Sequence, residues 1–248
     1  MARAALSGRL TWQLGRVREL VDETPRSRSI VLDLPNWRGH RAGQHVDVRL
    51  TAEDGYQAQR SYSIASAPED QHLVLTVERL EDGEVSPYLV DELRPGDELE
   101  LRGPIGGYFV WERSLGGPLL LIAGGSGIVP FRAILRHWSS GDRKIQARLL
   151  YSSRSLDEVI YRQELARLAK SGADVQLTLT RKWPDDWQGH RGRVDAALLK
   201  ELAWPPEPRP LVYVCGPTAF VEAVAEALVQ AGHEPAMIRT ERFGPTGT

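Results

Sequence analysis

Between residues 12 and 113 the hydrophobic and polar positions alternate in short runs, which is typical of β-strands with one buried face. The alternation is clearest in Gln44–Leu50 (QHVDVRL), and turns rich in glycine and proline separate the runs. The predicted strands are Trp12–Asp22, Arg28–Leu34, Gln44–Leu50, Arg60–Ala65, His72–Arg79 and Asp97–Arg102. Several short strands with regular turns predict an antiparallel β-barrel or sandwich.

One segment of this region carries a helix-start signal. Serine is a residue type that caps helix N-termini, and proline suits the first helical position. We therefore expect a helix over Ser86–Glu92, with Ser86 as its N-cap and Pro87 as its first residue.

After Gly116-Gly117-Pro118 the pattern changes, and apolar runs alternate with amphipathic stretches. The expected strands are Leu119–Ile122, Ile145–Ser152, Val175–Thr180, Leu211–Cys215 and Glu234–Arg239, and the expected helices are 130–138, 157–171, 195–202 and 218–231. Such alternation predicts a parallel sheet with helices on both faces. We therefore expect two domains, an antiparallel β-barrel over residues 1–113 and a Rossmann-like α/β domain over residues 114–248.

The segment Arg181–Gly192 has no periodicity and predicts a long loop. It contains two tryptophans, Trp183 and Trp187, beside several charged residues. They could form a lid over a ligand, form a docking surface, or pack against the edge of their own domain.

The segment Leu119–Pro130 (LLLIAGGSGIVP) joins a buried strand to a helix through a glycine-rich turn. This geometry brings backbone N–H groups and a helix N-terminus up to a phosphate. Its spacing, GGxGxxP, differs from the GxGxxG of the dinucleotide fingerprint. The turn therefore predicts a phosphate site, with a tight turn that binds nothing as the alternative.

Bulk composition narrows the function classes. The chain has 248 residues, 42% hydrophobic and 26% charged, which is ordinary for a soluble globular protein. A net charge of -2 favours neither nucleic acid nor an anionic membrane as a partner. Because no apolar run has the length of a membrane span or of a signal-peptide core, we expect a cytoplasmic protein.

The single cysteine, Cys215, restricts redox chemistry. One thiol can form neither an internal disulfide nor a dithiol pair, and an iron–sulfur cluster requires several cysteines. No spacing of histidine, cysteine and aspartate indicates a metal site. Any redox activity must therefore depend on an organic cofactor.

The tetrapeptide Arg60-Ser61-Tyr62-Ser63 (RSYS) lies on a predicted barrel strand. Alternation places Arg60 and Tyr62 on one face and the two serines on the other. An arginine beside an aromatic ring can bind an anion and a flat ring system. Taken alone, these residues favour an ordinary exposed strand face.

Together with four further motifs, RSYS resembles the ferredoxin–NADP reductase superfamily over nearly the whole chain. RSYS is similar to that family's flavin motif RxYS. The others are Gly83-Glu84-Val85-Ser86 (like its GxxS turn), Gly103-Pro104 with Gly106, Gly107 and Phe109 (like GPxG), Gly124–Pro130 (like its nucleotide loop) and Cys215-Gly216-Pro217 (like CGP). The resemblance implies an FAD-binding barrel followed by an NAD(P)-binding α/β domain.

The resemblance implies a set of flavin contacts. Arg60 would pair with the FAD diphosphate, Tyr62 would lie against the isoalloxazine, and Ser63 would lie near the hydride-accepting nitrogen. Strand Leu75–Glu78 would contact FAD through its backbone. The implied flavin-binding residues are Arg60, Ser61, Tyr62, Ser63, Val77, Gly83, Val85 and Ser86.

A second site would bind the nicotinamide coenzyme. Ser153 and Arg154 follow a predicted strand, and arginine binds phosphate oxygens bidentately, so they suit the 2′-phosphate of NADPH. An acidic residue there would favour NADH, and Arg154 as a plain surface residue is the alternative. In the resemblance Tyr161 lies near the adenosine. The lysine that is usual in the family is replaced here by Val159, and Arg162 could supply that charge instead. The implied residues are Gly124, Gly125, Gly127, Pro130, Ser153, Arg154, Tyr161, Arg162, Gly216 and Pro217.

Four residues are candidates for the catalytic site: Ser63, Cys215, Glu241 and Phe243. In the resemblance Cys215 borders the nicotinamide, although a buried small hydrophobe is the plain alternative. Phe243 would cover the flavin and Glu241 would polarise its surroundings. A disordered chain end is the competing interpretation for both.

The resemblance implies an FAD-dependent NAD(P)H oxidoreductase that passes hydride from NADPH, in preference to NADH, to FAD and then electrons to an acceptor. With one cysteine and 248 residues, we expect no iron–sulfur or haem domain in the chain and therefore a separate acceptor protein. We also expect a monomer. A ferredoxin, an oxygenase component or another metalloenzyme would fit. The alternatives are a free-flavin or quinone reductase and a non-catalytic FAD subunit that relays electrons.

Overall fold

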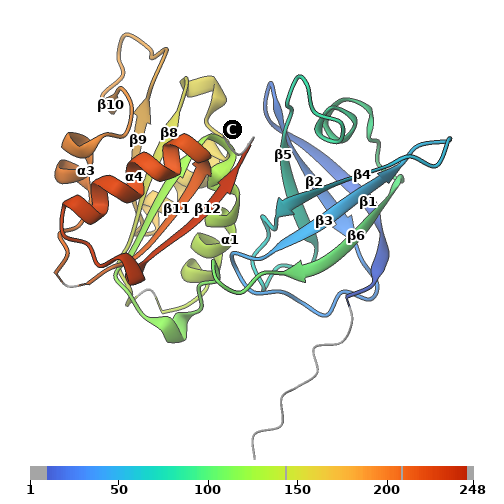
Figure 1. Ribbon diagram of the computed structural model, residues 1–248, viewed down its shortest axis with the longest axis horizontal. Helices are drawn as coiled ribbons and strands as arrows, with labels where there is room; N and C mark the ends of the chain where they lie inside the picture. Colours follow the sequence, from blue (N-terminus) through green and yellow to red (C-terminus); the bar gives the residue numbers. More distant parts are fainter. Residues whose placement is uncertain (1–9, 143, 208, 245–248) are drawn as a thin grey trace, which may run out of the picture.

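The computed structural model describes residues 10–142, 144–207 and 209–244. Its first part is a six-stranded antiparallel sheet with the order β4-β3-β6-β1-β2-β5. The strands are β1 (Trp12–Thr24), β2 (Ser27–Asp33), β3 (His45–Thr51), β4 (Gln57–Ser63), β5 (Leu73–Glu78) and β6 (Glu98–Ile105). All six were predicted, with ends that differ by a few residues. The sheet curls around a core of buried valine, leucine and isoleucine side chains into a barrel (Figure 1).

The barrel is closed at only one point. Its end strands β4 and β5 meet through the bridge between Ile64 and Leu75 and the hydrogen bond from Ala65 N–H to the Val74 carbonyl. Within the described residues no ladder joins β4 to β5 beyond this bridge. The barrel therefore has an open side, and the RSYS segment forms one edge of it.

The predicted helix at residues 86–92 is present, and Tyr88–Glu92 (η1) has π-helical geometry. The expectation that Ser86 caps it is wrong, because the capping position of η1 is occupied by Pro87 without a side-chain hydrogen bond. The Ser86 hydroxyl instead accepts a hydrogen bond from the Leu80 N–H at 3.1 Å. Ser86 thus closes the preceding turn and leaves the helix start uncapped.

The second part is a six-stranded parallel sheet with the order β10-β9-β8-β7-β11-β12. Its strands are β7 (Leu119–Gly124), β8 (Ala147–Ser153), β9 (Asp174–Leu179), β10 (His190–Arg191), β11 (Leu211–Pro217) and β12 (Ile238–Phe243). After β7 the chain builds outward through β8, β9 and β10, and then returns to the other side of β7 with β11. The strand order therefore reverses between β7 and β11, where open α/β sheets bind ligands at the carboxyl ends of the strands.

Helices cover both faces of this sheet, as predicted (Figure 1). Helix α1 (Ile128–Ser139) and α2 (Arg162–Lys170) pack on the face turned toward the barrel, while α3 (Ala196–Leu202) and α4 (Thr218–Gln230) pack on the other. Short 3-10 turns lie at η2 (Arg113–Leu115), η3 (Gly125–Gly127), η4 (Leu156–Glu158) and η5 (Pro235–Met237). Within the described residues, the helices are too short or too polar to cross a membrane.

Two elements of the α/β domain begin four or more residues later than predicted. Helix α2 starts at Arg162 because the preceding Tyr161 adopts a left-handed conformation with φ 61°, which ends any earlier helical run. Strand β12 starts at Ile238 because Pro235 opens a 3-10 turn. The shift carries β12 through Glu241 to Phe243, so the competing interpretation of a disordered end is wrong for these residues.

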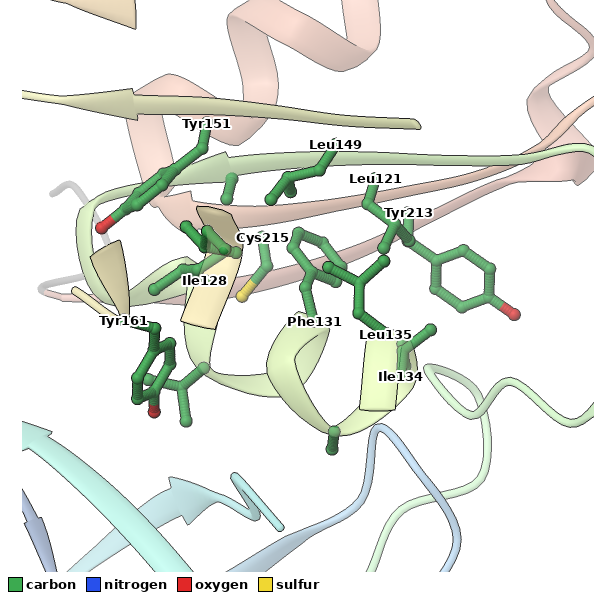
Figure 2. Close-up of a cluster of buried hydrophobic side chains, with 14 of the residues drawn as sticks. Leu121, Ile128, Phe131, Ile134, Leu135, Leu149, Tyr151, Tyr161, Tyr213 and Cys215 are labelled. Atoms are coloured by element: carbon green, nitrogen blue, oxygen red, sulfur yellow. The ribbon is translucent and has the colours of Figure 1, made fainter. Parts of the chain in front are cut away.

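The two domains share one core. Phe109 from the barrel domain lies between Phe131 of α1 and Tyr213 of β11, with ring centroids 5.8 and 5.2 Å away. The Tyr161 hydroxyl lies 2.5 Å from the Thr76 hydroxyl of β5, and Figure 2 shows the Tyr161 side chain directed toward the barrel strands. Packing and polar contacts therefore fix the domains relative to each other.

We expect Tyr161→Phe to lower the free energy of unfolding by about 1 kcal/mol, because it removes a buried hydrogen bond between the domains. Urea denaturation followed by circular dichroism measures the change. Tyr108→Phe is a matched control, since the Tyr108 hydroxyl bonds to the Ile238 carbonyl from a residue that is 63% exposed. Equal effects of the two substitutions would contradict the assigned role of Tyr161.

Candidate functional site

Two loops meet where the strand order reverses, one after β7 and one after β11. A Cβ on Gly127 would overlap the Cys215 carbonyl, so the two backbones touch there. Cβ atoms on Gly124 and Gly216 would come within 2.9 and 2.7 Å of the Phe220 ring. These glycines are therefore required by the packing of the loops and of Phe220, a cause that the sequence analysis did not identify.

Gly125 is the glycine of this turn that faces the other domain. Its φ of 56° lies in the left-handed region, which favours glycine. The atom closest to a Cβ placed on it would be a carboxylate oxygen of Glu78, at the end of β5, 3.9 Å away. The turn thus combines the N-terminus of the twelve-residue helix α1 with a position beside the open side of the barrel.

Ser63, Cys215 and Glu241 come together at this edge, although they lie far apart in the sequence. The Ser63 hydroxyl, at the end of β4, donates a hydrogen bond to Glu241 Oε1 at 3.3 Å. Glu241 pairs with Cys215 in the ladder between β12 and β11. This arrangement brings three of the four predicted catalytic residues into one cluster that spans both domains.

Burial determines the protonation of this cluster. It raises the pKa of Glu241 to about 7, against the opposing effect of the Ser63 hydrogen bond. Burial, reinforced by the Glu241 carboxylate, also raises the pKa of the Cys215 thiol well above its usual value. Cys215 is 2% exposed, and Figure 2 shows its sulfur near Ile128 and Phe131. It therefore remains a neutral thiol, which does not favour a role as a nucleophile.

Phe243, the fourth candidate, is the last residue of β12 and pairs with Pro217. Its side chain is half-buried and packs against the core that the two domains share. This location is at the same sheet edge as Cys215 and Glu241. A role in covering a flavin stays a prediction.

On the open side of the barrel, Arg60 forms an ion pair with Glu84 at 2.5 Å, and the Tyr56 hydroxyl donates to the same carboxylate at 2.8 Å. Sequence analysis quoted Glu84 within its motif but assigned it no role. Tyr62 is half-buried against the barrel core. Val77 and Val85 are fully buried in that core, so only their backbone atoms are available to a ligand.

Ser61 points to the outside of the barrel. Its hydroxyl donates to Asp47 Oδ1 at 2.7 Å, and Arg102 binds the other carboxylate oxygen of Asp47 at 2.7 Å. Gly83 lies where a Cβ would approach the Ser86 hydroxyl to 2.7 Å, so the turn from Gly83 to Ser86 is closed tightly on itself. The side chains of Ser61 and Ser86 are therefore engaged by the protein.

The predicted coenzyme residues outside the glycine-rich turn fall into two groups, one with exposed and one with buried side chains. Arg154 and Arg162 are exposed, and Arg154 directly follows β8. The hydroxyl of Ser153 is buried and donates to the Ser155 carbonyl at 3.2 Å. Tyr161 is 3% exposed in the domain interface, away from the surface where the adenosine was expected. Pro130 is buried in the first turn of α1, and Pro217 is exposed at the end of β11.

The sequence analysis missed a second pair of cations at this edge. The backbone N–H groups of Arg181 and Lys182 donate to the Arg154 carbonyl at 2.9 and 3.0 Å. A signal was available, because both residues come almost directly after a parallel strand, as Arg154 does. The loop that follows is partly ordered by β10, and Trp187 packs against its own domain with its indole N–H on the His190 carbonyl.

The raised pKa of Glu241 gives a pH dependence of stability. Because its folded-state pKa of about 7 exceeds the ordinary value of 4.5, protonated Glu241 stabilises the fold below the ordinary value, and this contribution is lost as the pH rises through about 7. The free energy of unfolding of the wild type should therefore decline between about pH 5 and about pH 8. We expect Glu241→Gln to remove the part of this decline that comes from Glu241, as measured by urea denaturation at each pH. Ser63→Ala should raise the pKa of Glu241 further, because it removes the hydrogen bond that lowers this pKa. A Glu241 pKa near 4.5 in the wild type would contradict the burial of this carboxyl.

Two family models match the chain. The oxidoreductase FAD-binding domain matches residues 17–110, and the oxidoreductase NAD-binding domain matches residues 121–226. The FAD/NAD-binding domain of nitric oxide dioxygenase from Vibrio cholerae has a similar structure, with a TM-score of 0.84 and 31% identity. That match covers 94% of this chain and 99% of the other.

Two curated relatives are similar over most of the chain. Ferredoxin–NADP reductase B of Sorangium cellulosum is 35% identical, over 82% of this chain and 84% of its own length. The glycine betaine monooxygenase reductase subunit of Chromohalobacter salexigens is 30% identical over 95% of this chain, which spans 66% of that relative's length. With both domains matched in this order, the chain belongs to the ferredoxin–NADP reductase superfamily of FAD-dependent NAD(P)H oxidoreductases.

Proposed function

We propose that this protein passes electrons from NAD(P)H through FAD to a separate acceptor protein. The observation that carries the proposal is the contact between Ser63 and Glu241. It places the end of the flavin motif beside the strand that neighbours Cys215, where the strand order of the parallel sheet reverses. A flavin in the barrel and a nicotinamide at the sheet edge would therefore meet at this cluster.

The residues on the open side of the barrel fit a dinucleotide flavin. Arg60 is exposed and can exchange its ion pair with Glu84 for a diphosphate oxygen. Tyr62 provides an aromatic side chain two residues along the same strand face. The Gly83 turn offers backbone close to this arginine, because Glu84 within it already reaches Arg60.

The sheet edge fits the coenzyme. The Gly124–Gly127 turn and helix α1 would present backbone N–H groups to a diphosphate, and the Cys215–Pro217 end of β11 borders the same point. Arg154 would bind a 2′-phosphate, which favours NADPH over NADH. The Ser153 hydroxyl already donates to the Ser155 carbonyl, so the preference for NADPH rests on Arg154 and not on Ser153.

Bound FAD would supply the hydride-accepting ring and the ability to release electrons singly or as a pair. The chain's own residues would orient the two reacting rings and shield them from water. Ser63 keeps a hydroxyl at the junction of the domains, and Glu241 holds a proton there below about pH 7, which limits negative charge beside the reacting rings. Phe243 would shield the site from water at the end of β12.

The relatives support a protein acceptor. They include the reductase subunit of a glycine betaine monooxygenase and the ferredoxin reductase component of a 3-ketosteroid-9-alpha-monooxygenase from Mycobacterium tuberculosis. We propose a ferredoxin or an oxygenase component as the acceptor of this protein.

Anaerobic titration of the FAD-loaded protein tests the electron donor. We expect about one equivalent of NADPH to bleach the visible flavin absorbance, faster than NADH does. Arg154→Gln should raise the KM for NADPH about 10-fold to 100-fold and leave that for NADH nearly unchanged, because the lost interaction is with the 2′-phosphate. A wild-type protein that neither coenzyme reduces would overturn the proposed donor.

Glu84 competes with a bound diphosphate for Arg60. We therefore expect Glu84→Gln to lower the dissociation constant for FAD about twofold to fivefold, as fits an exposed charge pair. Quenching of flavin fluorescence measures it. Glu81→Gln is the matched control, because Glu81 pairs with Arg79 on a neighbouring turn. Weaker FAD binding by Glu84→Gln would show that Glu84 supports the cofactor instead.

A further inference from the structure

We infer that the carboxylate of Glu78 weakens the binding of the coenzyme by repelling its diphosphate, and so sets the affinity of the protein for NADPH and NADH alike. The inference rests on the proposed function, since it concerns the coenzyme that the Gly124–Gly127 turn would hold. It assigns an electrostatic role to a barrel residue that the sequence analysis connected with FAD only through its backbone.

Strand β5 lies on the side of the barrel that faces the α/β domain (Figure 1). Every second residue of the strand is buried in the barrel core: Leu73, Leu75 and Val77. The residues between them face the other domain, where Val74 packs against the shared core and the Thr76 hydroxyl contacts the Tyr161 hydroxyl. Glu78 continues this second set. The atom closest to a Cβ placed on Gly125 would be one of its carboxylate oxygens, 3.9 Å away. Glu78 therefore faces the glycine-rich turn from the opposite domain.

The charge of Glu78 reaches the carboxyl edge of the parallel sheet. Tyr151 pairs with Ala123 in the ladder between β8 and β7, and Ala123 directly precedes the glycine-rich turn. Burial raises the pKa of Tyr151 above its ordinary value, and the Glu78 carboxylate adds to this rise. The carboxylate therefore acts at the strand ends where the coenzyme would bind.

Glu78 is a half-buried carboxylate without a partner of opposite charge. In the part of the chain that the structure describes, its side chain forms neither a hydrogen bond nor an ion pair. Cations that could have neutralised it are paired elsewhere. The next residue, Arg79, pairs with Glu81 at 2.5 Å, and Arg132 of α1 pairs with Glu164 at 2.8 Å. The negative charge of Glu78 is therefore uncompensated.

The glycine-rich turn has little positive charge to offset this carboxylate. From Gly124 to Phe131 the sequence is GGSGIVPF, which contains no cation. A diphosphate there would be held by backbone N–H groups and by the dipole at the start of α1, which is equivalent to about half an elementary charge. Glu78 opposes this with a full negative charge, so it lowers the affinity for a dianionic diphosphate. Such repulsion would favour release of the oxidised coenzyme once hydride has been transferred.

Calorimetric titration of the FAD-loaded protein with ADP-ribose, which carries the diphosphate but no nicotinamide, tests the inference. We expect Glu78→Gln to lower the dissociation constant about 3-fold to 30-fold in dilute buffer, because it removes a charge from beside a dianion. Glu78→Lys should lower it further, because attraction replaces repulsion. The gain should shrink at about 0.5 M salt, since salt screens the interaction, whereas a change caused by altered packing would not depend on salt.

Glu19→Gln is the matched control. Glu19 is an exposed glutamate of β1 that also forms no ion pair within the described residues, so this variant should bind ADP-ribose as the wild type does. In steady state, Glu78→Gln should lower the KM for NADPH and for NADH by similar factors, since both coenzymes carry the diphosphate. The dissociation constant for FAD should stay unchanged, because β5 would contact FAD through its backbone.

An unchanged dissociation constant for ADP-ribose in Glu78→Gln would overturn the inference, and so would a raised one, because the carboxylate would then bind the ligand. An equal gain in Glu19→Gln, a gain that does not depend on salt, or tighter binding of FAD in place of ADP-ribose would also overturn it. So would failure of both the wild type and Glu78→Gln to bind ADP-ribose. The proposed function fails in a different way, through a wild-type flavin that neither NADPH nor NADH reduces. The two failures are therefore read from separate measurements on the same preparation.

Discussion

The packing of Phe109 between α1 and β11 is the interaction on which the rest of the site depends. Phe109 belongs to the barrel domain, yet it is buried against Phe131 and Tyr213 of the α/β domain. The neighbouring Val110 carbonyl accepts hydrogen bonds from the Tyr213 hydroxyl and from Arg239. Apolar burial thus sets the distance between the domains, and the polar contacts fix their orientation. Without this shared core, nothing would hold Ser63 of the barrel domain in contact with Glu241 of the α/β domain.

This arrangement explains why a redox site needs few chemically reactive side chains. Hydride transfer between two bound rings depends on their mutual position, so the protein contributes orientation and a controlled environment. The cluster at the interface fits that requirement. Cys215 is kept neutral by burial, and Glu241 holds a proton up to about pH 7. Neither group adds a full negative charge at the point where the two ligands would meet.

Much of this architecture could be predicted from the sequence, because the relevant patterns are local. Alternation along strands such as Gln44–Leu50 predicted the barrel, and the change after Pro118 predicted the parallel sheet. Contacts between distant segments were not predictable in the same way. Tyr161 was expected near the adenosine, but its side chain is buried in the domain interface, where its hydroxyl contacts Thr76. Pro235 delays β12, which converts an expected tail into the strand that carries Glu241. Glu84 and Phe220 act through neighbours that no local pattern reveals.

A fixed domain interface would present one face of the nicotinamide to the flavin. Single-turnover reduction of the FAD-loaded protein with coenzyme stereospecifically deuterated at nicotinamide C4 tests it most directly. We expect slower bleaching with the label on one face and an unchanged rate with the label on the other. Equal rates with the two labels would contradict a direct transfer at a rigid interface.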